Sequence, residues 1–170
     1  GFWADLARSE LVWDRPFTRT LDSSRAPHYR WFTDGQLNVS ANCLDRHLET
    51  RGHKTALIFE GEPGDTRRLS WRELHAEVCR LANALKKQGV GHGDRVVLMM
   101  RNIPAFHWLD MAVVFLGATP VSIYNSSSPE EIQYLADHAE AEIAIIEDAG
   151  FPQRMLKVRD ELPVLQKIFV

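Results

Sequence analysis

The 170 residues of this chain fit one domain, because a chain of this length buries roughly 70% of its unfolded surface in an ordinary core. Hydrophobic residues make up 45% of the sequence and charged residues 25%, as in globular proteins, and the net charge is −3. This charge gives no basic field for nucleic acid or anionic lipid, so the sequence argues against a protein that binds either one. No apolar run approaches the ~20 residues of a transmembrane segment, so it also argues against a membrane-spanning protein.

The two cysteines, Cys43 and Cys79, both fall on apolar faces of expected helices. We favour two reduced, buried thiols of a cytosolic protein, with a disulfide or a metal pair as the alternative. No basic segment followed by an apolar one stands at the start of the chain, so nothing indicates secretion and we expect a cytoplasmic location. The seven histidines lack the spacing of a metal site, and we assign no catalytic or metal-ligating residue.

Residues 1–37 are expected to form an N-terminal arm. Residues 2–12 fit a short helix with Trp3, Leu6 and Ala7 on one side, and an extended, aromatic-rich segment follows it. Such a segment cannot form a core by itself, so it either packs on a larger body or folds onto the rest of this chain. The aromatic residues expected to anchor it are Trp13, Phe17, Tyr29, Trp31 and Phe32.

Regular patterning begins after the arm. Apolar residues at helical spacing predict a helix over 41–51 that stops at Gly52. A strand at 55–60, a turn rich in Gly, Pro and Asp, and a short return strand at 68–69 predict a β-hairpin.

A long helix is expected after the hairpin. Ser70 and Glu73 form the S-x-x-E capping box that opens it, and Gly89 ends it. Gly89, Gly91 and Gly93 follow a helix and precede a strand, which is the opposite order to a dinucleotide-binding fingerprint. The apolar stripe of this helix consists of Leu74, Val78, Leu81, Ala82 and Leu85.

Strands and helices then alternate to the last residue. The short loops between them imply right-handed crossovers, so the predicted fold class is α/β with a βαβαβαβ parallel-sheet unit. The last strand is apolar and no helix follows it, so we expect residues 38–170 to be the opening α/β subdomain of a larger domain. The expected strands are 95–100, 119–124, 142–147 and 167–170, and the expected helices are 104–116, 128–139 and 150–160.

The strand-to-helix loops are the candidate site, because ligands of open parallel sheets collect at the carboxyl ends of the strands. The loop after the second strand contains Asn125, Ser126, Ser127 and Ser128 at the start of a helix. One interpretation is a plain helix cap, since Glu130 and its neighbour already complement the helix dipole. The alternative is a contact with an anionic cofactor through the hydroxyls and backbone N–H groups.

A small basic cluster, Arg154, Lys157 and Arg159, falls in the last expected helix. It is either a solvated face or, at Arg154, a contact to a phosphate such as that of coenzyme A. The sequence contains no Walker A motif, no GxSxG elbow, no HExxH and no CxxC.

Four ordered pieces of residues 31–96 resemble the N-terminal region of the acetyl-CoA synthetase family, within the AMP-forming acyl-CoA synthetases. They are W-F-x-x-G-x-L-N-V-S, N-C-L-D-R-H, E-G-E-x-G-D and A-N-x-L-K-x-x-G-V-x-x-G-D-R-V. Residues 101–170, with the loop NSSSPEEI, are more similar to bacterial fatty-acid–CoA ligases. Acetyl-CoA synthetases typically have Gly-Gly-Phe-Ser where this chain has Tyr124 to Ser128, so either the branch is unusual or the two portions differ in origin.

This resemblance implies an enzyme that activates a carboxylic acid, either a fatty acid or acetate, with ATP and Mg²⁺ to an acyl-adenylate, then transfers the acyl group to coenzyme A. It implies that the phosphate loop, the acyl pocket and the catalytic residues lie in the remaining part of the same enzyme, so these 170 residues alone are expected to be inactive. Asn125, Ser126, Ser127 and Arg154 lie near the places where the family approaches coenzyme A. The alternatives are a stand-alone scaffold or cofactor-binding module, and a fatty acyl-AMP ligase; acyl chain length and oligomeric state stay open.

Overall fold

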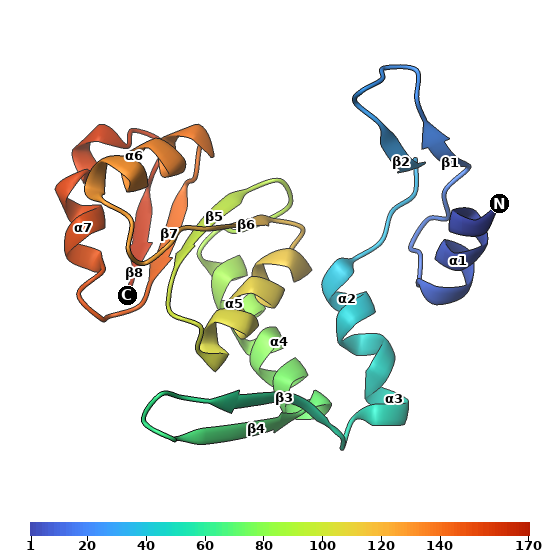
Figure 1. The fold of residues 1–170 in the computed structure, drawn as a ribbon, viewed down its shortest axis with the longest axis horizontal. Coiled ribbons are helices and arrows are strands. Elements are labelled where there is room, and N and C mark those ends of the chain that lie inside the picture. Colours follow the sequence, from blue (N-terminus) through green and yellow to red (C-terminus); the bar gives the residue numbers. More distant parts are fainter.

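A four-stranded parallel sheet lies at the centre of the computed structural model, which describes all 170 residues (Figure 1). The strand order across the sheet is β6-β5-β7-β8, so the chain first adds β6 on one side of β5 and then adds β7 and β8 on the other. This arrangement confirms the predicted parallel α/β fold. The strands are β5 (Arg95–Met99), β6 (Thr119–Ser122), β7 (Ile143–Ile146) and β8 (Lys167–Phe169).

Helices cover both faces of this sheet (Figure 1). On one face, Val96 and Leu98 of β5 pack against α4 and α5, and on the other Val97 and Met99 pack against α6 and α7. All four side chains are fully buried, as the unbroken apolar run predicts for a strand covered on both sides. The helices are α4 (Trp71–Lys87), α5 (Pro104–Phe115), α6 (Pro129–His138) and α7 (Pro152–Lys157).

The predicted capping box opens α4. The Ser70 hydroxyl accepts the backbone N–H of Glu73, and the Glu73 carboxylate accepts the backbone N–H of Ser70 at 2.8 Å. The predicted stripe faces the core, although Leu81 is only partly buried. Gly89 follows the helix with φ = +99°, a left-handed conformation that favours glycine.

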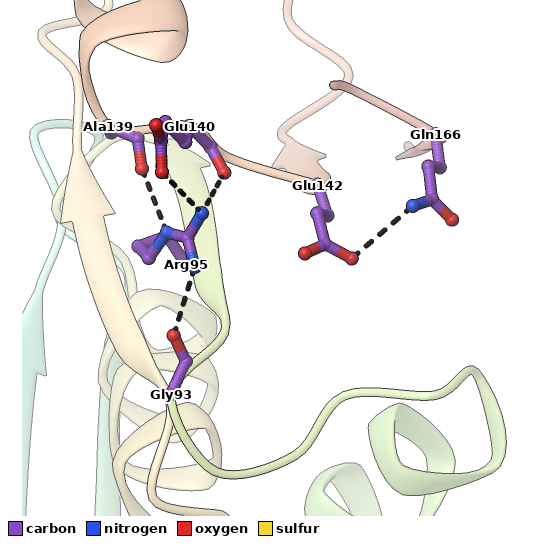
Figure 2. Close-up of polar contacts among 6 residues, drawn as sticks. All are labelled: Gly93, Arg95, Ala139, Glu140, Glu142 and Gln166. Atoms are coloured by element: carbon purple, nitrogen blue, oxygen red, sulfur yellow. Dashed lines mark hydrogen bonds and ion pairs between the residues drawn. The ribbon is translucent and has the colours of Figure 1, made fainter.

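The amino-terminal edge of the sheet is held by Arg95 (Figure 2). Its guanidinium donates to the carbonyl oxygens of Ala139 at 2.9 Å and Glu140 at 2.7 Å, where α6 ends. These carbonyls have no partner within the helix, so Arg95 satisfies them and fixes the turn from α6 into β7.

A β-hairpin precedes α4, as predicted. It consists of β3 (Thr55–Glu60) and β4 (Thr66–Ser70), which pair antiparallel. The Arg67 guanidinium lies 4.8 Å from the ring centroid of the buried Trp108, so a cation–π contact ties the hairpin to α5.

The single helix predicted over 41–51 is wrong. The segment forms α2 (Val39–Cys43), a 3-10 turn at Asp45–His47 and α3 (Leu48–Arg51). Leu44 interrupts it with φ = −119°, outside the usual helical range, and its side chain is buried in the core beneath α4 and α5. Burial of this one leucine therefore overrides the continuous helical pattern.

Gly52 stops α3 at the predicted place, but not through a left-handed cap, because its φ is −52°. A Cβ atom there would lie 2.4 Å from the Leu48 carbonyl oxygen and 3.0 Å from the Arg72 guanidinium. The position therefore requires glycine for space and not for backbone conformation.

The first 37 residues form more local structure than the predicted extended arm. They contain α1 (Phe2–Glu10) and an antiparallel pair, β1 (Arg19–Asp22) with β2 (Arg30–Thr33), and lie to one side of the sheet (Figure 1). A small cluster of their own surrounds the buried Phe17. The arm therefore has a minimal core, which sequence reasoning did not expect.

The aromatic anchors of the arm divide into two groups. Phe17 is buried and Trp13 and Phe32 are half-buried, whereas Tyr29 and Trp31 are exposed, so the prediction that all five anchor the arm is wrong for the last two. Of the three residues predicted to share one side of α1, Ala7 is buried together with Ala4, whereas Trp3 and Leu6 are exposed.

Two other expectations change. The last predicted helix, 150–160, is α7 followed by a separate 3-10 turn at Arg159–Glu161, because Val158 between them leaves helical geometry.

Cys79 is half-buried but Cys43 is exposed, which corrects the predicted burial of Cys43, and both are free thiols. No helix has the length and apolar composition to cross a membrane.

We expect Ile132→Ala to destabilise the chain by about 2–5 kcal/mol, because Ile132 of α6 is fully buried against β5 and β7 and truncation leaves a cavity. The matched control is Ile58→Ala on β3, where the side chain is 62% exposed and the loss should stay below about 1 kcal/mol. Urea unfolding followed by circular dichroism measures both. Equal losses would contradict the assignment of α6 to the core.

Candidate functional site

The carboxyl ends of β5 and β7 are joined by an ion pair between Arg101 and Glu147. The backbone N–H of Arg101 donates to one carboxylate oxygen of Glu147 at 2.7 Å, and its Nε donates to the other at 2.8 Å. The Glu147 backbone N–H donates in turn to the Met99 carbonyl at 3.0 Å. Arg101 and Glu147 therefore bridge the point where the chain leaves the two strands toward opposite faces of the sheet.

This pair shifts the ionisation of both partners. The hydrogen bond from Arg101 is the main cause that holds the pKa of Glu147 below its ordinary value of 4.5, against the opposing effect of burial. The same hydrogen bond raises the pKa of Arg101. The Glu147 side chain is only 11% exposed, so water screens its charge little. Its negative charge is already paired with the guanidinium of Arg101.

A pocket of about 480 Å³ opens beside this ion pair, between the ends of β5 and β6. Asn102 and Phe106 line it from the β5 side, and Tyr124 and Asn125 line it from the β6 side. The predicted site residue Asn125 therefore lines a hollow that has an aromatic ring and an amide group on each side. Tyr124, which is 83% exposed, also lines this pocket and was not among the predicted site residues.

The serine loop caps α6, as the plain-cap interpretation predicts. The Ser128 hydroxyl accepts the backbone N–H of Glu131, and the Glu131 carboxylate accepts the backbone N–H of Ser128 at 2.9 Å. Glu131 is therefore committed to the cap. The pKa of Glu130 is lowered, chiefly by its hydrogen bond to its own backbone N–H.

The structure brings Arg154 to this same loop. Its Nη1 donates to the Ser127 carbonyl at 3.0 Å, and its guanidinium lies 5.4 Å from the ring centroid of Phe151. Ser127 is buried, so it meets Arg154 through its backbone, whereas Ser126 is exposed. Two features predicted separately, the serine loop and the first residue of the basic cluster, thus form one surface.

The rest of the basic cluster is dispersed. Lys157 is exposed on α7, while the Arg159 guanidinium donates to the Leu162 carbonyl at 3.3 Å. A shallow hollow of about 620 Å³ lies over the serine loop, and Tyr124 separates it from the pocket between β5 and β6. Both hollows lie at the carboxyl edge of the sheet, where the sequence predicts ligand binding.

One further cluster of reactive groups, Asp45, His75 and Cys79, lies away from this edge. Asp45 Oδ1 and Cys79 Sγ both approach His75 Nε2, at 3.2 and 3.4 Å. A nucleophile relay needs the acid and the thiol on opposite ring nitrogens. Burial, and secondarily the charge of Asp45, also raise the pKa of the Cys79 thiol, so this cluster is not arranged as an activated nucleophile.

A family model described as AMP-binding enzyme matches residues 44–170, most of the chain. The chain belongs to the AMP-binding enzyme family. A second model, described as the acetyl-coenzyme A synthetase N-terminus, matches residues 1–43. The resemblance to acetyl-CoA synthetases that the sequence motifs indicate is therefore confirmed.

Curated relatives with similar sequences are also named acetyl-coenzyme A synthetase. The acetyl-coenzyme A synthetase of Methylobacillus flagellatus is 49% identical over 151 residues, which are 88% of this chain and 23% of that protein. The enzyme of the same name from Thiobacillus denitrificans is 50% identical over 149 residues, or 87% of this chain and 23% of that protein. The chain thus spans about a quarter of their length. Because the match to the Methylobacillus protein is 151 residues long, it must extend into residues 101–170. This is the portion whose motifs are more similar to fatty-acid–CoA ligases.

The crystal structure of the anthranilate CoA ligase AuaEII in complex with anthranoyl-AMP also matches. Its TM-score is 0.68 and its sequence is 29% identical, over 76% of this chain and 24% of that one. The neighbour is an adenylate-forming ligase, which agrees with the fold class predicted here.

We expect Glu147→Gln to destabilise the chain by roughly 1–2 kcal/mol near neutral pH, because it weakens charge-assisted hydrogen bonds at a mostly buried carboxylate. The pKa of Glu147 is lowered in the folded chain, so its stabilising contribution is complete above about pH 4.5 and is lost as pH falls through the lowered value. Urea unfolding from pH 7 down to pH 3 should therefore show the two proteins converging in acid.

Glu77→Gln on α4 is the matched control. Glu77 pairs with the exposed Arg80 three residues along the helix, and such pairs contribute less than about 0.5 kcal/mol. A pH-independent gap between wild type and Glu147→Gln would contradict the pairing with Arg101.

Proposed function

We propose that the full-length enzyme carrying these residues is an ATP-dependent, AMP-forming ligase that joins acetate to coenzyme A. A carboxylate oxygen of the acid attacks the α-phosphorus of ATP, pyrophosphate leaves, and an acyl-adenylate forms. The thiol of coenzyme A then attacks the acyl carbon, a thioester forms and AMP leaves. Mg²⁺ neutralises the charge that develops on the phosphates.

One observation carries this proposal: the chain is 39–50% identical to proteins named acetyl-coenzyme A synthetase over stretches that cover up to 89% of it. The resemblance further implies that ATP, Mg²⁺ and the acid bind mainly in the remaining part of the same enzyme. Within this proposal, residues 1–37 are the N-terminal arm and residues 38–170 the first α/β subdomain.

We also propose that Asn125, Ser126, Ser127 and Arg154 form part of the coenzyme A site. The donor set fits an anionic ligand: Arg154 keeps N–H groups beyond the one it gives to Ser127, Ser126 offers an exposed hydroxyl, and Asn125 an amide. Ser127 contributes by holding Arg154 through its carbonyl. The exposed Lys157 adds a second positive charge nearby on α7.

The full-length enzyme should convert acetate, MgATP and coenzyme A into acetyl-CoA, AMP and pyrophosphate, separated by liquid chromatography. Accumulation of adenylate without thioester would instead identify an acyl-AMP ligase, and turnover of dodecanoate but not acetate would identify a fatty-acid ligase. Residues 1–170 alone should release no pyrophosphate, because the resemblance assigns the phosphate loop to the rest of the enzyme. Turnover by these residues alone would contradict that assignment.

In the full-length enzyme, Arg154→Ala should raise the KM for coenzyme A about tenfold, which corresponds to ~1.4 kcal/mol of lost binding energy. Adenylate formation, measured as acetate-dependent exchange of pyrophosphate into ATP, should stay unchanged, because that half-reaction does not use coenzyme A. The control is Arg159→Ala, since Arg159 bonds to the Leu162 carbonyl and not to the serine loop. An equal effect of both variants would contradict the proposed site.

A further inference from the structure

The arm exposes several apolar side chains, most of them aromatic. Phe2, Trp3 and Leu6 of α1 are 71%, 55% and 40% exposed, and Trp31 of β2 is 49% exposed. The rings are in contact: the Phe2 and Trp3 centroids lie 5.0 Å apart, and those of Trp3 and Trp31 6.3 Å apart, both in edge-to-face geometry. We call these four residues, three aromatic and one aliphatic, the aromatic patch.

The helix that carries most of this patch is the reverse of an ordinary surface helix. Its buried side consists of Ala4 and Ala7, which pack on Phe17, and its solvent side carries the large rings. A helix buries its bulkiest apolar side chains when it has a partner for them. Large aromatic side chains are also the ones that contribute most to protein contacts. The solvent side of α1 therefore has the composition of an interface.

The α/β body of this chain does not cover the patch. The arm's buried cluster shares no residue with the two clusters around the sheet. Polar contacts attach the arm to the body on another side: Asn42 exchanges two 2.8 Å hydrogen bonds with the backbone of Val12, and Arg46 donates to the Glu10 carbonyl.

We propose that the aromatic patch packs against the part of the AMP-binding domain that the full-length enzyme carries beyond residue 170. The first listed curated relatives are about four times as long as their match to this chain, so ample polypeptide exists to supply the partner surface. This inference goes beyond the proposed function, because it concerns intramolecular packing and does not depend on which acid is activated.

Two other occupants fit less well. Four partly exposed side chains offer roughly 400 Å² of apolar surface, whereas a stable dimer buries about 800 Å² per partner. An intramolecular contact can be smaller, because it does not lose the free energy of bringing two molecules together. A lipid surface is also disfavoured, because α1 carries Asp5 and Glu10 against the single cation Arg8, where interfacial helices are rich in Lys and Arg.

Hydroxyl-radical footprinting of the full-length enzyme measures whether the patch is covered. Oxidation at Trp3 and Trp31, each normalised to the same residue in the urea-unfolded enzyme, should be at least fivefold slower than at Tyr29. Tyr29 is the matched control, because it lies in the same arm and is 55% exposed, like Trp3. Equal relative rates at all three residues would overturn the proposal, and no variant needs to fold for this measurement.

A photo-crosslinking amino acid in place of Trp3 identifies the occupant. The expected product is a cross-link within one molecule, from position 3 to a peptide beyond residue 170, at a yield that does not change on tenfold dilution. A cross-link between two copies, to a peptide outside that region or to no peptide at all would each overturn the proposal. Neither experiment measures catalytic activity. Both therefore test the packing of the patch even if the enzyme does not act on acetate.

Discussion

The burial of β5 on both faces is the constraint on which the rest of the molecule depends. Four consecutive residues of this strand are fully buried, so helices must lie on both sides of the sheet and β5 must be an inner strand. Right-handed crossovers then send the chain to one face through α5 and to the other through α6 and α7. At the amino-terminal edge of the sheet, the Arg95 guanidinium fixes the turn between α6 and β7 through the carbonyls of Ala139 and Glu140 (Figure 2). The candidate site lies at the opposite, carboxyl edge.

The ends of β5 and β7 are where a sheet of this order ordinarily receives a ligand. Here Arg101 and Glu147 satisfy each other at that point. A carboxylate that accepts two short hydrogen bonds from one arginine has little reason to bind a new group, and it would repel an anionic one. Two hollows lie on the β6 side, around Tyr124 and the serine loop.

The fold was largely predictable because its periodic patterns are local. The capping box at Ser70, the stripe of α4 and the alternation of apolar strands with helices each depend on neighbours a few residues apart. The break at Leu44 was not predictable, because it depends on burial against distant helices. The ion pair between Arg101 and Glu147 could not be predicted from the sequence either, since it forms only because β5 and β7 are neighbours in the sheet. Asn125 and Arg154 could be selected singly, but only the folded chain places Arg154 on the Ser127 carbonyl.

The arm shows why a hydrophobic pattern can predict a helix and still misplace its faces. Trp3, Leu6 and Ala7 share one side of the predicted helix, and the usual expectation turns the large residues inward. In the structure, Ala4 and Ala7 pack on Phe17 instead, and the bulky residues face outward. A contiguous patch of exposed apolar side chains commonly marks a surface that contacts another one. The sequence pattern of α1 is therefore consistent with two partners, Phe17 on one side and a second surface on the other.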